Sequence, residues 1–278
     1  MQEKKLTLKS AFVEVFGAGL APLGFVRLKK TKLPFFVRLI NNEIIHVITC
    51  HSTRSFEYGY HKFEILAGVA TVYRKQLNLG DSLIYHLNWL YNTSKFYNMA
   101  AQGTDVDGSD EIPAEFSYQE QDESSMYNEM QHALEIVTQI TMPVLNGVVD
   151  LQSCIEYFYQ FHSGLLVLNQ IESPSIANIE TLSGESLILI KADYRNDYEE
   201  RWRSELAGME QGMIDGKIGY TRADFEIWRT ETEKSISEQY QIRMQLLNTP
   251  HLHALAIQEA DRRKAVNTEL LRAHGLPL

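Results

Sequence analysis

The chain has 278 residues, of which 44% are hydrophobic and 22% charged, and its formal net charge is −10 at pH 7. This composition is typical of a folded protein with one large domain or two smaller ones, and it excludes collagen-like, coiled-coil and disordered chains. No run approaches the roughly 18 consecutive apolar residues of a membrane span, and the first residues have no signal-peptide pattern. We therefore expect a cytoplasmic protein with no membrane partner.

The charge is unevenly distributed along the chain. Residues 1–104 hold 13 Lys/Arg and 6 Asp/Glu, a net charge of +7. Residues 105–190 hold no Lys/Arg and 15 Asp/Glu, a net charge of −15, and residues 191–278 hold 13 Lys/Arg and 15 Asp/Glu, a net charge of −2. Such asymmetry indicates either a surface for an anionic partner or internal pairing of the basic beginning with the acidic middle. Of these two interpretations we favour internal pairing.

The first 75 residues predict a helix followed by an antiparallel sheet. Apolar residues at helical spacing predict a helix over 6–20, and alternating segments predict strands, listed here by range: 25–30, 35–40, 43–50 and 62–74. Asn41 and Asn42 fit a two-residue hairpin turn, because asparagine tolerates positive φ. That turn would pair Leu39 with Ile44 and place apolar residues on both faces, so we expect both faces to be partly covered.

The middle of the chain is less regular. The segment 83–91 favours a helix over a strand, and the polar, acidic segment 101–125 predicts a long solvated loop. Helical spacing over 126–143 should end near Pro143, because proline disrupts a helix interior. A helix over 150–162 and a short strand over 186–191 complete this part.

Three helices are expected after residue 190. Stripes of apolar residues over 194–213 and 225–247 predict two antiparallel helices, with Thr221 capping the second, and a more polar helix covers 251–274. The fold class predicted is α+β, with an N-terminal helix and an antiparallel sheet, then a helical hairpin and a last helix. We expect an α+β domain over 1–190 and a helical extension over 191–278.

The opening pattern is an N-terminal helix, then LAPLGFVRLKK, then PFFVRLINNEIIHVITCHS. It resembles the bacterial domain-of-unknown-function family 4304, in which a helix leads through a Gly-Phe step into a meander of strands. The likeness covers about the first 75 residues and, more loosely, 130–162. It implies an α+β fold and no particular chemistry.

No motif identifies an enzyme class, because the chain lacks a phosphate-binding glycine loop, an HExxH helix, a GxSxG elbow and a CxxC pair. His46, Cys50, His51 and His61 are close in sequence. However, His46 and Cys50 would be about 13 Å apart on one face of a strand, too far for a catalytic pair. We expect both cysteines, Cys50 and Cys154, to be free thiols, and we predict no metal site and no cofactor.

Basic residues of the predicted sheet form the candidate binding site, which consists of Arg27, Lys29, Arg38 and Arg54. Guanidinium and ammonium groups hold carboxylates or phosphates, although a solvated or internally paired face would show the same pattern. We favour a non-enzymatic module that binds a protein or a small anion, and exclude nucleic acid, because the −15 middle segment opposes a polyanion. The alternative is a hydrolase-like or phosphate-processing site of Arg38 and Arg54 with one of Glu57, Glu64 or His61.

Overall fold

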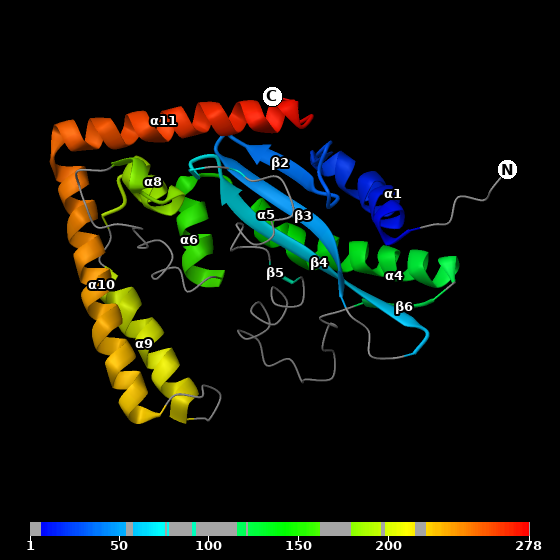
Figure 1. Cartoon of the computed structure of the whole chain (residues 1–278), viewed down its shortest axis with the longest axis horizontal. Helices are drawn as coiled ribbons and strands as arrows, with labels where there is room; N and C mark the ends of the chain where they lie inside the picture. The colour runs from blue at the N-terminus through cyan, green and yellow to red at the C-terminus, as the bar shows by residue number, and fades with distance from the viewer. Residues whose placement is uncertain are drawn as a thin grey trace. The chain divides into compact units, whose positions relative to one another are not determined.

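The computed structural model describes residues 7–53, 58–75, 77, 91–92, 116–120, 122–161, 179–195, 198–214 and 221–277 (Figure 1). The chain splits into two compact units. Unit 1 comprises Met1–Val72, Gln76–Cys154 and Val266–Leu278, and unit 2 comprises Tyr73–Lys75 and Ile155–Ala265. These boundaries differ from a single division at residue 190, so the two expected domains stay a prediction.

Unit 1 contains an antiparallel six-stranded sheet, which confirms the α+β class. Five strands follow one another in the order β1 (Val26–Arg27), β2 (Phe36–Ile40), β3 (Ile44–Thr53), β4 (Tyr60–Thr71) and β5 (Tyr91–Asn92). The sixth strand, β6 (Phe116–Gln119), also pairs with β4. The strand expected over 25–30 is shorter than predicted, and β4 pairs with β3 without a bulge at Gly68, which lies opposite Val47.

The β2–β3 turn confirms the position of the hairpin but corrects its register. Asn41 and Asn42 both have positive φ, and the amide of Glu43 donates to the carbonyl of Ile40 at 2.9 Å. Ile40 pairs with Ile44, so Glu43 is an additional residue between the paired strands. The expected pairing of Leu39 with Ile44 is therefore wrong, and the side chains of β2 share faces with the opposite set of β3 residues.

Helix α1 (Leu8–Leu20) packs on one face of this sheet. Its N-cap is Thr7, whose side chain accepts from the amide of Ser10 in a capping box. Phe12 is fully buried and lies edge-on to Phe36 of β2, with ring centroids 5.5 Å apart. The 3-10 turn η1 (Ala21–Leu23) then leads through Gly24 into β1. The helix predicted over 6–20 is confirmed.

The second helical segment of unit 1 is continuous past the expected stop. Helix α4 (Glu123–Ile136) runs through a π-helical segment, η2 (Val137–Thr141), into α5 (Met142–Asn146). Pro143 lies at the start of α5, directly after the π-helical segment η2, and the helical segment passes through the proline instead of ending there. Among the described residues, no single helix is long and apolar enough to cross a membrane; only α4–α5 together with α6 would pass by length and composition, as a pair bent by 120°.

Part of the predicted acidic loop is a strand. Phe116 is buried in β6 and stacks on Phe63 of β4, with ring centroids 5.2 Å apart. A polar composition over 101–125 concealed this short pairing. Residues 101–115 of that loop, and residues 83–90 of the helix expected over 83–91, lie outside the described residues, and Tyr91 belongs to β5.

Unit 2 is helical in the part of it that the structure describes. Its elements are the later residues of α6 (Leu151–Phe161), the 3-10 turn η3 (Ile179–Thr181), α8 (Gly184–Lys191), α9 (Tyr198–Ile214), α10 (Arg222–Asn248) and the first part of α11 (Pro250–Ala273). The strand expected over 186–191 is wrong, because Ser183 caps a helix there by accepting from the amide of Ser186. Thr221 caps α10 as predicted, and an ion pair of 3.5 Å from Arg222 to Glu210 joins α10 to α9.

Candidate functional site

The predicted binding residues separate into two environments. Arg27 and Lys29 are exposed on β1 and just after it, whereas Arg38 is half-buried and Arg54 lies outside the described residues. Register places Arg27 opposite Phe36, hence on the same face as Arg38. Arg27 is nevertheless exposed, whereas Arg38 bonds to groups inside unit 1, so these two described members of the predicted set have different surroundings.

Arg38 is part of a hydrogen-bond network inside unit 1. Its Nη2 donates to Nδ1 of His46 at 2.9 Å and to Oδ1 of Asn146 at 2.8 Å, and its Nη1 donates to the carbonyl of Leu23 at 3.1 Å. The guanidinium also lies 4.8 Å from the ring centre of Phe25. Through these groups Arg38 holds β2 to the neighbouring segments, whereas its buried Nε has no hydrogen-bond partner among the described residues.

His46 is the other buried member of this network. Its Nε2 lies 2.9 Å from the carbonyl of Val148, which can only accept, so Nε2 carries the proton and Nδ1 accepts from Arg38. Burial, together with the charge of Arg38, lowers the pKa of His46 to about 3. The imidazole is therefore neutral and fixed as one tautomer, which is the chemistry of a structural histidine.

The other histidines do not complete a catalytic group. Register places His46 and Cys50 on one face of β3 and His51 on the other, as predicted. His51 lies 3.3 Å from Glu64, on the face opposite to Arg38. His61 shares a face with Arg38 but is about 27 Å further along β4, at eight residues of 3.4 Å each. Arg38, Glu64 and His61 of the alternative enzyme site therefore do not converge, and its other members, Arg54 and Glu57, lie outside the described residues.

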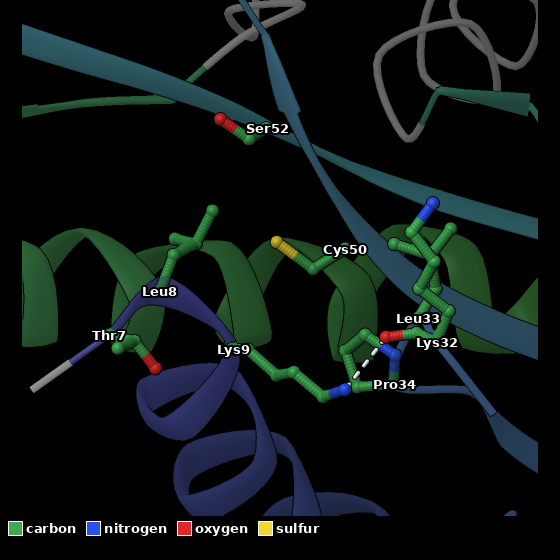
Figure 2. A pocket seen from close by; sticks show the side chains of 8 residues that line it. All are labelled: Thr7, Leu8, Lys9, Lys32, Leu33, Pro34, Cys50 and Ser52. Atoms are coloured by element: carbon green, nitrogen blue, oxygen red, sulfur yellow. Dashed lines mark hydrogen bonds between the residues drawn. The ribbon is translucent and has the colours of Figure 1, made fainter. Parts of the chain in front are cut away.

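A pocket of about 250 Å³ opens between the first turn of α1, the β1–β2 loop and β3 (Figure 2). Its walls are apolar, and polar side chains surround the opening. The apolar lining comes from Leu8, Leu33, Pro34 and Cys50, and the polar lining from Thr7, Lys9, Lys32 and Ser52. As Figure 2 shows, Lys9 reaches across to the carbonyl of Lys32, to which its Nζ donates at 2.7 Å.

Cys50 forms part of the pocket wall and is 5% exposed. Burial raises the pKa of its thiol well above the ordinary value, and the charge of Glu64 raises it further. A protonated thiol is a poor nucleophile, so Cys50 acts here as a small apolar surface. Cys50 and Cys154 are both free, as the sequence predicted.

Two cationic side chains, Lys9 and Lys32, line this pocket, and further basic residues precede Lys32 in the chain. Lys9 of α1, Arg27 of β1, and Lys29, Lys30 and Lys32 of the loop that follows are all exposed. We call these five residues the basic edge. The prediction included Arg27 and Lys29 but missed Lys9, Lys30 and Lys32; the density of basic residues in RLKKTK (27–32) was the available signal, and the contact of Lys9 with this loop was not predictable.

Unit 2 holds a second buried charge, whose contacts are structural. Arg263 is 1% exposed; its Nε donates to Glu259 at 2.7 Å and its Nη1 to the carbonyl of Leu182 at 2.8 Å. The same guanidinium donates to the carbonyls of Tyr73 and Glu180. Hydrogen bonds from Arg262 and from Arg263 outweigh burial and hold the pKa of Glu259 below its ordinary value.

No group of three or more His, Cys, Asp or Glu that could hold a metal ion occurs among the described residues. In comparisons with known proteins, the chain matches no family model, no curated protein and no solved structure. The resemblance to domain-of-unknown-function family 4304 therefore stays a prediction. The pocket, together with the basic edge that contributes Lys9 and Lys32 to its lining, is the candidate site that the described geometry offers.

Proposed function

We propose that this protein is a non-enzymatic binding module that engages an acidic segment of a partner protein through the basic edge. The observation that carries this proposal is the exposure of all five cationic side chains of the basic edge, two of which, Lys9 and Lys32, line an apolar pocket. Opposite charge steers a partner to such a surface and fixes its orientation.

The surroundings of Arg38, His46 and Cys50 support binding rather than catalysis. Arg38 and His46 bond to each other and to neighbouring backbone and amide groups, and the thiol of Cys50 is protonated. A general acid or base needs a pKa near the working pH, and a pKa of about 3 for His46 does not fit that role. The described residues thus favour the interaction module over the phosphate-processing alternative.

A cytoplasmic location belongs to the same proposal. Its support is the pair of free thiols, Cys50 and Cys154, since reducing compartments keep cysteines unpaired. We also retain membership of the bacterial family of unknown function as a proposal, based on the opening helix and meander.

The test is binding of a fluorescent acidic peptide, alternating Glu and Ser, measured by anisotropy at low salt. We expect Lys30→Glu with Lys32→Glu to weaken binding about tenfold or more, because each reversal replaces an attraction by a repulsion. The matched control is Lys75→Glu with Lys234→Glu, which changes the net charge equally at exposed positions outside the basic edge.

Retained binding by the control and loss by the first variant support the proposal. Failure of the native chain to bind the peptide at millimolar concentration, or equal loss in both double variants, overturns it. Tighter binding of DNA or RNA than of the peptide overturns it as well.

A further inference from the structure

The pocket inside the basic edge has the dimensions of a single side chain. Its volume of about 250 Å³ is below the roughly 300–1,000 Å³ of sites that enclose drug-sized ligands or cofactors. Protein interfaces, by contrast, commonly place one large apolar side chain in a pocket of the partner. Size therefore favours an anchoring residue of a protein over a small-molecule ligand.

The walls of the pocket have the matching chemistry. Leu8 and Leu33 are half-buried, Pro34 is buried, and the Cys50 thiol is neutral. An aliphatic or aromatic side chain would lose its water there without displacing a charge. A charged or amide side chain would have to give up hydrogen bonds to water and find few replacements at the apolar wall.

The charges at the opening of the pocket favour particular residues next to the anchoring side chain in the partner. Lys9 uses one of its three ammonium donors on the Lys32 carbonyl, which holds its charge at the mouth of the pocket. Lys32, whose carbonyl accepts this bond, also lines the pocket and is exposed. Carboxylates next to the anchoring residue would meet these two cations, whereas basic neighbours would be repelled.

We propose that the pocket takes one large apolar side chain, such as Leu, Ile, Met or Phe, from an acidic segment of the partner protein. This inference rests on the proposed function and defines the partner as a short acidic motif with an apolar anchor. Burying such a side chain raises affinity by about tenfold to a hundredfold over the acidic residues alone.

Two fluorescent peptides of equal charge test the inference, one alternating Glu and Ser throughout and the other with a single central Leu in place of Ser. We expect the native chain to bind the Leu peptide at least about tenfold more tightly. Cys50→Leu, which fills the pocket from its wall, should bind the two peptides with equal affinity. Cys154→Ala, at a fully buried cysteine in α6, is the control and should keep the difference.

The outcomes separate the two proposals. Equal affinity of the native chain for the two peptides overturns the pocket inference and leaves the proposed function standing. Binding of neither peptide overturns the proposed function and the inference with it. Binding only to vesicles containing phosphatidylserine, with no binding of either peptide, assigns the surface to lipid and also overturns both.

If Cys50→Leu does not fold, a second measurement, made on the native chain, tests the same inference. In the native chain labelled with ¹⁵N, the Leu peptide should shift the amide resonances of Leu8, Leu33 and Cys50 more than the Ser peptide does. Identical shifts with both peptides would contradict an apolar anchor in the pocket.

Discussion

Lys29 and His274 hold each other by two hydrogen bonds. The amide of Lys29 donates to the carbonyl of His274 at 2.8 Å, and Nδ1 of His274 donates to the carbonyl of Lys29 at 2.8 Å. Lys29 follows the edge strand β1, so the segment after α11 occupies main-chain groups that an unprotected sheet edge would offer to another chain. Gly275, at φ 95°, continues this contact against the aliphatic part of the Lys29 side chain.

We expect His274→Ala to lower the free energy of unfolding by about 0.5–1.5 kcal/mol, because it removes one of these hydrogen bonds. Amide exchange at Lys29 should also become faster. Urea denaturation and hydrogen exchange measure the two effects. The control is His253→Ala, which replaces a half-buried histidine within α11. Equal stability of the two variants would contradict a role for the His274 ring.

Two glycines of α1 should respond oppositely to alanine. A Cβ at Gly17 would make an ordinary contact of 3.6 Å with Phe36, whereas a Cβ at Gly19 would lie 2.5 Å from Leu134 of α4. Alanine favours the helix by about 0.5–1 kcal/mol at either position, but at Gly19 the clash offsets this gain. We expect Gly17→Ala to be the more stable variant by at least about 1 kcal/mol in thermal or urea unfolding. The reverse order would show that α1 and α4 do not approach so closely.

Acid sensitivity should depend on His46. Its pKa is lowered to about 3 in the folded chain, against an ordinary value of 6.5. Between these values the unfolded chain takes up a proton that the folded chain does not, so the free energy of unfolding falls as pH falls. The slope is about 1.4 kcal/mol per pH unit, present below pH 6.5 and ending near pH 3. Glutamine does not titrate, so His46→Gln should lack this contribution to the pH dependence of the free energy of unfolding.

Urea unfolding at pH 7.5, 6 and 5 measures this effect for both chains. The stability difference between the native chain and His46→Gln should narrow with each step towards acid. Parallel pH dependence of the two chains would show that the folded chain protonates His46 normally.

Arg38 and Arg27 should behave as different kinds of residue. Arg38→Ala leaves the carbonyl of Leu23 and the amide oxygen of Asn146 without their donor, and should cost about 2–4 kcal/mol of stability. Arg27→Ala, at an exposed position, should change stability by less than about 0.5 kcal/mol. Urea unfolding distinguishes them. If Arg38→Ala were as stable as the native chain but bound the acidic peptide less tightly, Arg38 would be the ligand-binding residue that the sequence suggested.

Nucleic acid should not compete for the basic edge. The segment 105–190 carries 15 acidic and no basic residues, and the repulsion that it exerts grows with the number of negative charges on a ligand, so a nucleic acid is opposed more strongly than a short acidic peptide. We expect no shift of random single- or double-stranded DNA or RNA at micromolar protein and low salt in gel electrophoresis. Tight binding that weakens steeply with added salt and disappears in Arg27→Glu with Lys29→Glu would overturn this prediction.

The elements set by local patterns were predictable from the sequence. Helix α1, the hairpin at Asn41 and Asn42, and the Thr221 cap follow from side chains within a few residues of one another. The strand register was not predictable, because Glu43 enters the turn as an additional residue and transfers every side chain of β2 to the other face. For SLILIK (186–191), a short apolar run has no decisive period, and the Ser183 cap determined a helix.

The site was only partly predictable for a related reason. Arg27 and Arg38 are equally basic in the sequence, and what separates them is the contact of Arg38 with Asn146, 108 positions away. Likewise, nothing near Cys50 in the sequence indicates that Leu8 and Leu33 lie beside it. The charge density of residues 27–32 was a signal for part of the basic edge, of which only Arg27 and Lys29 were predicted, whereas the pocket exists only through contacts between distant segments.

The contacts of α11 have a consequence for the order of folding. Arg263 completes the hydrogen bonding of carbonyls at Tyr73, Glu180 and Leu182 in unit 2, while Asn267 bonds the carbonyl of Val72 in unit 1. In each unit, carbonyls in earlier parts of the chain therefore receive these hydrogen bonds only after α11 has been synthesised. During synthesis, the sheet of unit 1 would leave the ribosome well before residues 266–278 of the same unit. Contacts between residues so far apart in the sequence slow folding.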